Sequence, residues 1–416
     1  MKTQLPSAFF IRCLLLFVFL FPVLSSAQQT EVYQYRGEVE ADGDALVSAF
    51  LVVVGTNIST ITNSEGEFSL KVPAEHADAS VNVSHLGYKT RTLPAEFFRN
   101  GEVEIELEQI AEVLTEISIF TEEDPRRVVR EMIAGKRDNY VTEPAQMTAF
   151  YRETIKKGRR NVSLSEAVVN INKKPYSSFA RDEISLVKAR KSADYERLDT
   201  LALKLRGGPF NPLVLDIMKN PDYMFYQEDL MNYEFEFDNP QKINNRYLYV
   251  INFEDRNKEL PWYFGKLYID AETKALVQAD FEMNVDNRNV ASSMFVKKKP
   301  GGTRVYPVHV AYKAEYRQQD GKWYFGYGNT EMEFLINWKR KLFNSRYKVE
   351  SELAVTDWIM GEGPAVAKNL YLKPDVIMAD DVSGFVDLNF WGENNIIEPD
   401  KSIENAIEKI QKNLEN

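Results

Sequence analysis

The stretch GKLYIDAETKALVQADFEM, residues 265–283, indicates the fold class of the larger part of the chain. From residue 277 to residue 283 every second side chain is apolar, and the side chains between them are polar. This period of two is typical of a β-strand with one buried and one solvated face. Residues 270–273, Asp-Ala-Glu-Thr, supply a turn after an earlier run that contains Leu267 and Ile269. The stretch therefore predicts an antiparallel hairpin.

Similar patterns extend on both sides of this hairpin. Upstream, residues 248–253 are apolar on both alternating sets except for Asn252, which is consistent with a strand that is buried on both faces. Downstream, an alternating run over residues 308–317 reaches a turn at Asp320-Gly321 and returns through the aromatic residues 323–325. The sequence therefore predicts a β-rich domain over residues 146–416.

Helical patterns are few in this domain. They occur near residues 212–219 and at residues 402–414, which close the chain. That is too little helix to cover both faces of a flat sheet, and bending would shorten exposed edges. We therefore expect a chain that is mainly β with some α, containing a curved antiparallel sheet, an open half-barrel, with helices and an apolar space on its concave side.

Composition limits the classes of function. The chain has 416 residues, 44% of them hydrophobic and 27% charged, which is typical of globular protein. The formal net charge is -11, so a basic nucleic-acid footprint and electrostatic attachment to anionic lipid are both disfavoured.

The first 27 residues are typical of a secretory signal peptide. Lys2 and Arg12 are their only charges, an apolar run follows from Cys13 to Val23, and small residues precede position 28. Cleavage after Ala27 would remove the only cysteine, so the mature chain would have no disulfide. A cysteine-free exported chain of this size fits the bacterial envelope, in the periplasm or at the outer membrane, better than a secreted animal protein. A retained N-terminal anchor is the alternative; no later stretch is long and apolar enough to span a membrane.

Short strand-like runs separated by turn signals fill residues 30–110. The motifs are Gly37-x-Val39, Val52-x-Val54-Gly55-Thr56, Thr62-Asn63-x-x-Gly66-x-Phe68-x-Leu70 and Leu86-Gly87-Tyr88. These residues resemble the carboxypeptidase regulatory-like domain, a small transthyretin-like β-sandwich. The resemblance implies that Gly66 relieves a hairpin turn and that Phe68 enters the core. Members of this family accompany metallocarboxypeptidases but carry none of their zinc ligands.

A helix is predicted over residues 121–140, linking the two parts of the chain. Asp124-Pro125 begins it, and apolar residues recur at helical spacing. Its arginines, Arg126, Arg127 and Arg130, either contact an anion or form a solvated face, and we favour the solvated face.

The chain as a whole resembles Bacteroidetes envelope proteins in which this sandwich precedes a β-rich domain. Residues 150–153, Phe-Tyr-Arg-Glu, open that domain, and residues 390–399 close it. The run at residues 265–270 is also similar to the central hairpin of LolA-type lipoprotein carriers. These resemblances imply an envelope protein that binds a hydrophobic ligand, a lipid or an envelope partner.

Residues with catalytic or metal-binding spacing are not recognisable. His76, His85 and His309 lack the spacing of a zinc site. Ser-x-x-Lys occurs at Ser185 and Ser345, but both lie in strand-like runs, where positions three apart point to opposite faces. We therefore expect no catalytic, cofactor-binding or metal-binding residues and no cofactor.

Two further groups of residues are ambiguous. Glu331 and Glu333 share a strand face, and Asp380-Asp381 lie in a loop; acidic solvated surface is the favoured interpretation of all four. The aromatic runs at 262–264 and 323–325 place rings on both strand faces, so they either pack in the core or line a hydrophobic or sugar-stacking pocket.

The resulting hypothesis is a non-enzymatic exported protein of the bacterial envelope. Its sandwich would be an adaptor, and its β-rich domain would bind a hydrophobic ligand or an envelope partner. The alternatives are a hydrolase related to metallocarboxypeptidases and a pure envelope scaffold.

Overall fold

The computed structural model describes residues 31–110, 124–158, 160–193, 207–221, 224–225, 229–243, 246–257, 259–295, 302–339, 343–364, 366–378, 390–405 and 407. The predicted signal peptide, the beginning of the predicted linking helix at 121–123, Asp380-Asp381 and the end of the predicted C-terminal helix lie outside these residues.

The N-terminal part is a sandwich of two small sheets. The first contains β1 (Val32–Ala41), β2 (Asp44–Ala45), β5 (Glu67–Pro73) and β8 (Val103–Glu106), with β8 parallel to β1. The second has the order β4 (Ser59–Ile61), β3 (Phe50–Val53), β6 (Val81–Ser84), β7 (Arg91–Leu93). Short 3₁₀ turns, η1 (Ala74–His76) and η2 (Ala95–Phe98), complete it.

Gly66 and Phe68 lie where the family resemblance implied. Gly66 has a φ of +79°, and a Cβ there would be 2.6 Å from the Val39 carbonyl oxygen, so only glycine fits. The Asn63 side chain holds the same turn by accepting hydrogen bonds from the backbone N–H groups of Glu65 and Glu67. Phe68 is buried in the sandwich core, beside Phe98.

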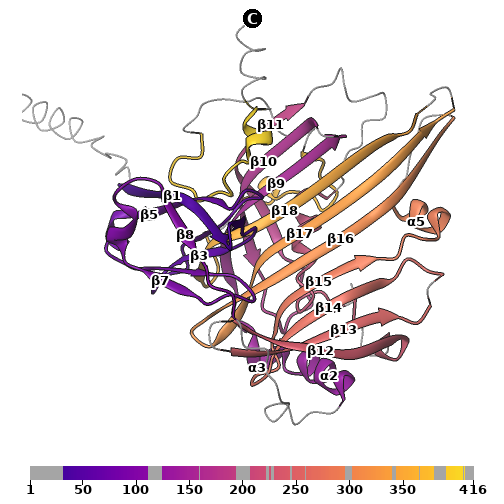
Figure 1. Cartoon of the computed structure of the whole chain (residues 1–416), viewed down its shortest axis with the longest axis horizontal. Helices are drawn as coiled ribbons and strands as arrows, with labels where there is room; N and C mark the ends of the chain where they lie inside the picture. The colour runs from indigo at the N-terminus through magenta and orange to yellow at the C-terminus, as the bar shows by residue number, and fades with distance from the viewer. Residues whose placement is uncertain are drawn as a thin grey trace, which may run out of the picture.

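The C-terminal part is one ten-stranded antiparallel sheet. Its order is β11 (Glu183–Ala193), β10 (Arg160–Lys173), β9 (Ala145–Lys157), β18 (Ser345–Met360), β17 (Lys322–Trp338), β16 (Thr303–Gln319), β15 (Leu276–Met283), β14 (Tyr263–Asp270), β13 (Arg246–Asp255), β12 (Tyr233–Ile243). The sheet is strongly curved and does not close, because β11 and β12 stay apart at its two ends (Figure 1). This confirms the predicted fold class and the hairpin at residues 265–283, which is β14–β15.

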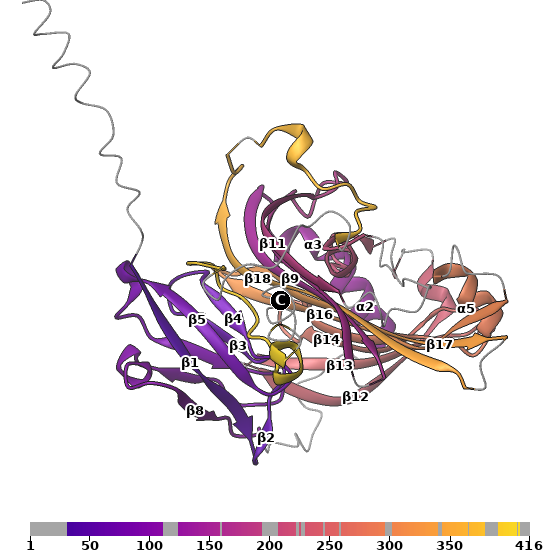
Figure 2. The same ribbon diagram turned by 90° about the horizontal axis from the view of Figure 1, so that it is seen from above.

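The two faces of this sheet have different neighbours (Figure 2). On β9, Met147, Ala149 and Tyr151 belong to a large hydrophobic core that also contains Val128 and Met132 of the helix α2 (Pro125–Ala134). Phe150, on the opposite face, packs instead with Phe50 and Ile61 of the sandwich and with the C-terminal segment 390–397. The sandwich and the helices therefore cover opposite faces of one sheet.

The concave side of the sheet holds the large core rather than an open space in the described part of the chain. The described residues 214–221 and 224–225, which follow the short helix α4 (Phe210–Leu213), contribute Leu215, Ile217 and Phe225 to it. The remaining short helices are η4 (Asp229–Asn232), α5 (Arg288–Phe295) and η5 (Lys368–Leu370).

The predicted linking helix is interrupted at Gly135. It consists of α2 and a separate short helix, α3 (Lys136–Asn139). As expected, the Asp124 side chain caps α2 by accepting a hydrogen bond from the Arg126 N–H. Arg126 also donates to the carbonyl oxygen of Tyr233 on the edge strand β12, so this arginine has a structural contact.

Candidate functional site at the domain junction

The sandwich is fixed to the sheet by polar contacts around β4 and β18. Arg317 of β16 lies between the rings of Phe50 and Trp358, with its guanidinium carbon 5.5 Å and 4.7 Å from their centroids. It donates hydrogen bonds to the Ser59 hydroxyl and to the Asn57 carbonyl oxygen. The half-buried arginine therefore connects the two domains through aromatic and polar contacts.

The C-terminal segment closes the junction from a third side. The Asn395 side chain pairs with the backbone of Lys71 in the sandwich, accepting from its N–H at 2.7 Å and donating to its carbonyl oxygen at 3.0 Å. Thr60 donates to the Ile396 carbonyl oxygen, and the Trp391 ring packs edge-on against Phe150 of β9. Three segments that are distant in sequence thus form one body.

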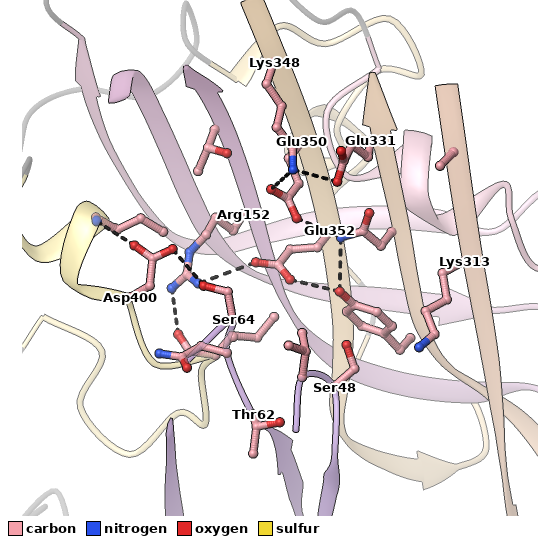
Figure 3. A pocket seen from close by; sticks show the side chains of 18 of the residues that line it. Ser48, Thr62, Ser64, Arg152, Lys313, Glu331, Lys348, Glu350, Glu352 and Asp400 are labelled. Atoms are coloured by element: carbon pink, nitrogen blue, oxygen red, sulfur yellow. Dashed lines mark hydrogen bonds and ion pairs between the residues drawn. The ribbon is translucent and has the colours of Figure 1, made fainter. Parts of the chain in front are cut away.

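A hollow of about 430 Å³ lies between these three segments. The sandwich contributes Ser48, Thr62 and Ser64, strands β9 and β16 to β18 contribute the floor, and the C-terminal segment contributes Asp400 (Figure 3). Its charged lining has four cations and four carboxylates: Arg152, Lys156, Lys313, Lys348, Glu331, Glu350, Glu352 and Asp400. The hollow is therefore polar and close to neutral in formal charge.

Arg152 is the buried centre of this lining. Its Nε is 2.8 Å from Glu166, which also pairs with Arg190 at 2.5 Å, and its Nη2 donates to the Ile397 carbonyl oxygen at 2.7 Å. Burial would raise the pKa of Glu166, but Arg152 and Arg190 together hold that pKa below its usual value. The arginine thereby links β9 and β10 to the C-terminal segment.

Glu352 lines the hollow next to Arg152. It is 3.4 Å from Arg152 and accepts a hydrogen bond from the Tyr327 hydroxyl at 3.0 Å (Figure 3). Burial raises the pKa of Glu352 to about 7, although Arg152 opposes this shift.

The outer part of the floor is a lattice of cross-strand pairs. Lys348 lies 2.7 Å from Glu331, and Asn329 donates to Glu350 at 3.2 Å. These pairs place charged and hydrogen-bonding atoms on the floor, so the hollow suits a ligand that carries polar groups.

Glu153 is a second perturbed carboxyl, on the opposite face of β9. It is 2% exposed and accepts a hydrogen bond from the Tyr151 hydroxyl at 2.9 Å. Burial raises its pKa to about 7, against the smaller opposing effect of that hydrogen bond.

Because the folded-state pKa of Glu153 exceeds the unfolded value, its contribution favours folding below about pH 4.5 and is lost as pH rises through 7. Glutamine does not ionise, so the Glu153→Gln variant should not show this loss. The difference in free energy of unfolding between the variant and the unsubstituted protein should therefore shift in favour of the variant by up to about 3 kcal/mol between pH 4.5 and pH 8. Urea unfolding of both proteins across this pH range tests the prediction. The exposed Glu102→Gln substitution is the control, and a pH-independent difference for Glu153→Gln would contradict it.

The residues singled out in the sequence mostly lie outside the hollow. His309 lies beside Glu282 at 3.4 Å, and His76 beside Glu75 at 3.5 Å. Among the described residues no three histidine or acidic side chains gather as a metal site. Both Ser-x-x-Lys runs lie in strands, β11 and β18, as expected.

The structure shows the surroundings of the acidic residues and of the aromatic runs that the sequence left ambiguous. Glu331 and Glu333 are paired with Lys348 and Arg346, and Glu331 lines the hollow. Residues 323–325 are all buried, whereas Trp262 and Phe264 are exposed. Sequence reasoning gave no functional role to Arg152, Glu166, Arg190 or Glu352. Arg152 appeared only as part of the motif at residues 150–153, and the other three had no signal except charge inside long strands.

No helix within the described residues has both the length and the apolar character needed to cross a membrane.

Comparison with solved structures finds remote similarities over the C-terminal part. One is a domain assigned to outer membrane lipoprotein sorting from Vibrio parahaemolyticus, at 11% identity and a TM-score of 0.25, covering 59% of this chain and 94% of that one. A LolA superfamily protein from Nitrosomonas europaea has 11% identity and a TM-score of 0.22, covering 58% and 94%. MucB in the Pseudomonas aeruginosa MucA/MucB complex has 11% identity and a TM-score of 0.17, covering 58% and 100%. Values this low support no inference about ligands.

Among curated proteins none matches the chain significantly. One protein family does match: residues 35–119 fit the family model of the CarboxypepD_reg-like domain. This span contains the sandwich strands from β1 onward and the turn at Gly66. Over residues 35–119 the chain is therefore similar to the CarboxypepD_reg-like domain family.

Proposed function

We propose that the protein is an exported, non-enzymatic adaptor of the bacterial envelope that binds a protein partner at the junction hollow. The observation that carries this proposal is the joint construction of the hollow. The regulatory-like domain, the large sheet and the C-terminal segment all line it, so a partner bound there would contact all three. Export rests on the signal-like residues 1–27.

A protein partner fits the hollow better than a hydrophobic small molecule does. The lining alternates cations and carboxylates, which match the charged side chains and backbone groups of a polypeptide. The concave side, where a carrier of acyl chains would have its cavity, is packed with side chains from α2 and residues 213–225 in the described part of the chain. A lipid carrier would need that core to open.

The hydrolase alternative needs an acid and a base that are free to exchange protons with a substrate. Glu352, whose pKa burial raises to about 7, is the candidate acid or base of the hollow, and it is held by Arg152 and by the Tyr327 hydroxyl. We rank binding above catalysis because Glu331 and Glu350 pair with Lys348 and Asn329, which leaves Glu352 without an evident second group for acid–base catalysis among the described residues. The scaffold alternative differs from our proposal only in leaving the hollow unused.

A photo-crosslinking residue at Val47 tests the proposal in the producing cells. Val47 lies on the rim of the hollow and is 48% exposed; Tyr33 on β1, 41% exposed and absent from the lining, is the control position. We expect a defined polypeptide adduct from position 47 and none from position 33. Lys156→Glu in the hollow should abolish the adduct without changing the melting temperature, and Lys89→Glu on the sandwich surface should not.

The same preparations should be titrated with a fluorescent fatty acid. We expect no saturable uptake at micromolar concentrations, which correspond to about 8 kcal/mol of binding. Uptake of the fatty acid without a crosslinked adduct would favour the carrier. If neither an adduct nor uptake is observed, the pure scaffold is favoured.

A further inference from the structure

Three stretches of the chain are strongly basic, although the net charge of the chain is -11. Residues 156–161, 296–305 and 336–346 each contain four lysines or arginines, and none of the three contains Asp or Glu. These stretches include the connections from β9 to β10, from α5 to β16 and from β17 to β18. Positive charge is therefore concentrated where strands of the large sheet are joined.

The strand order β10–β9–β18–β17–β16 brings the three stretches to one edge of the sheet. Backbone hydrogen bonds connect them there. The Gly158 N–H donates to the Arg346 carbonyl oxygen at 3.1 Å, and the Lys339 N–H donates to the Gly302 carbonyl oxygen at 3.0 Å. Four strand spacings separate β10 from β16, so the edge extends over roughly 19 Å along the sheet.

The cations that the structure describes at this edge are open to solvent. Arg160, Arg304, Lys339 and Arg346 are all exposed. Arg346 pairs with Glu333 at 2.5 Å, and its side chain is still 61% exposed. Among the described residues no carboxylate forms an ion pair with Arg160, Arg304 or Lys339.

An apolar ring projects from the same edge. Phe343, in the β17–β18 connection, is 83% exposed. Phe179 is 99% exposed, but it lies in the β10–β11 connection, at the other end of β10 from Arg160. The combination of an exposed ring with exposed cations defines a surface that we call the basic tip: Arg160, Arg304, Lys339, Phe343 and Arg346.

The sandwich lies on the opposite side of the molecule from the basic tip. Figures 1 and 2 both place it across the molecule from the hairpin end of β17 and β18. The sandwich exposes acidic residues, with Glu38 of β1 directly opposite Glu104 of β8 and Glu106 nearby on β8. A negatively charged surface would attract the basic tip and repel the sandwich, which would orient the molecule. The net charge of the whole chain does not reveal this asymmetry.

We propose that the basic tip attaches the protein to a membrane surface that contains anionic phospholipid, with its cations at the headgroups and Phe343 at the level of the upper acyl chains. Lysine and arginine side chains are attracted to anionic leaflets, and aromatic rings are favoured at the boundary between headgroups and acyl chains.

An extended surface fits the basic tip better than a soluble anion does. The cations are distributed over several strands, whereas a single phosphate group is bound by donors that converge on one point. An acidic polypeptide would neutralise the cations but offers no apolar layer for Phe343. The attachment is independent of the junction hollow and of the function proposed for it.

Co-sedimentation of the chain without residues 1–27 with lipid vesicles tests this proposal. Vesicles of equimolar phosphatidylglycerol and phosphatidylcholine are compared with vesicles of phosphatidylcholine alone, and polyglutamate is the soluble polyanion. We expect binding to the anionic vesicles only. The affinity should fall roughly tenfold or more when sodium chloride is raised from 50 to 500 mM, because salt screens exposed charges.

A charge-neutralised variant assigns the binding to the basic tip. Arg160→Gln, Arg304→Gln and Lys339→Gln together should lower the affinity for anionic vesicles by roughly thirtyfold or more, because each basic residue at such a surface contributes roughly fivefold. The control loses the same charge outside the basic tip and should retain its affinity; its substitutions are Lys89→Gln, Arg99→Gln and Arg181→Gln. Melting temperatures confirm that both variants are folded.

A single labelled cysteine locates the contact. Cys13 is the only cysteine, so the chain without residues 1–27 has none and can be labelled at one chosen position. With an environment-sensitive fluorophore on Phe343→Cys, anionic vesicles should shift the emission to shorter wavelength. The same label on Phe179→Cys should show no shift.

Four outcomes would overturn the proposal. They are absence of binding to anionic vesicles, equal losses of affinity in the two charge-neutralised variants, a fluorescence shift at position 179 but not at position 343, and binding of polyglutamate without binding of vesicles.

Discussion

Replacing Arg152 with methionine should lower the free energy of unfolding by about 3–5 kcal/mol, the range for removing one partner of a buried ion pair. Arg152 is 3% exposed, and its loss would leave Glu166 with one cation instead of two. It would also leave the Ile397 carbonyl oxygen without its donor at 2.7 Å. The substitution therefore removes charge compensation and one attachment of the C-terminal segment together.

Urea unfolding of the chain without residues 1–27 measures this effect. Arg346→Met is the matched control, since Arg346 forms an ion pair with Glu333 on the surface and its side chain is 61% exposed. Exposed pairs contribute about 0–1 kcal/mol, so the control should differ little from the unsubstituted protein. Equal losses for the two variants would show that Arg152 is not the centre of a buried network.

Replacing Phe68 with alanine should lower the free energy of unfolding by about 3–5 kcal/mol, because it removes a large ring from a packed core. Phe68 is 1% exposed and lies edge-on to Phe98, with 6.4 Å between the ring centroids. Since the sandwich is fixed to the sheet through Arg317 and Asn395, the loss should also weaken the junction.

Thermal and urea unfolding of the chain without residues 1–27 test this second prediction. Phe179, which is 99% exposed, provides the control substitution Phe179→Ala, and its midpoint should not change. Phe68→Leu should give an intermediate loss, because it keeps part of the buried volume. An unchanged midpoint for Phe68→Ala would place the ring outside the core and contradict the described sandwich.

The elements that sequence predicted well are those with local causes. The hairpin β14–β15 follows from a period of two and a turn within 21 residues, and the β16–β17 hairpin follows from Asp320-Gly321, both with positive φ. The turn at Gly66 needs only glycine's backbone freedom and the side chain of Asn63, three positions earlier. The linking helix was predicted as one piece but is interrupted at Gly135. Glycine has a low helix propensity, and the spacing of the apolar residues did not reveal this break.

On the concave side, where an apolar space was expected, the described residues form a large hydrophobic core. The sequence showed one apolar face per strand, but it could not show how much side-chain volume α2 and residues 213–225 would bring to that face.

By itself the sequence determined the fold class, the regulatory-like sandwich and the alternation of solvated and buried faces, because each of these depends on neighbours a few residues apart. Only the tertiary structure decided which solvated residues meet. Arg152 and Glu352 are 200 positions apart, and Lys71 and Asn395 are 324 apart. They meet because β9 pairs with β18 and because the C-terminal segment returns to the sandwich. Which distant strands pair depends on the packing of the complete fold. A pattern within a few residues of sequence therefore does not predict it.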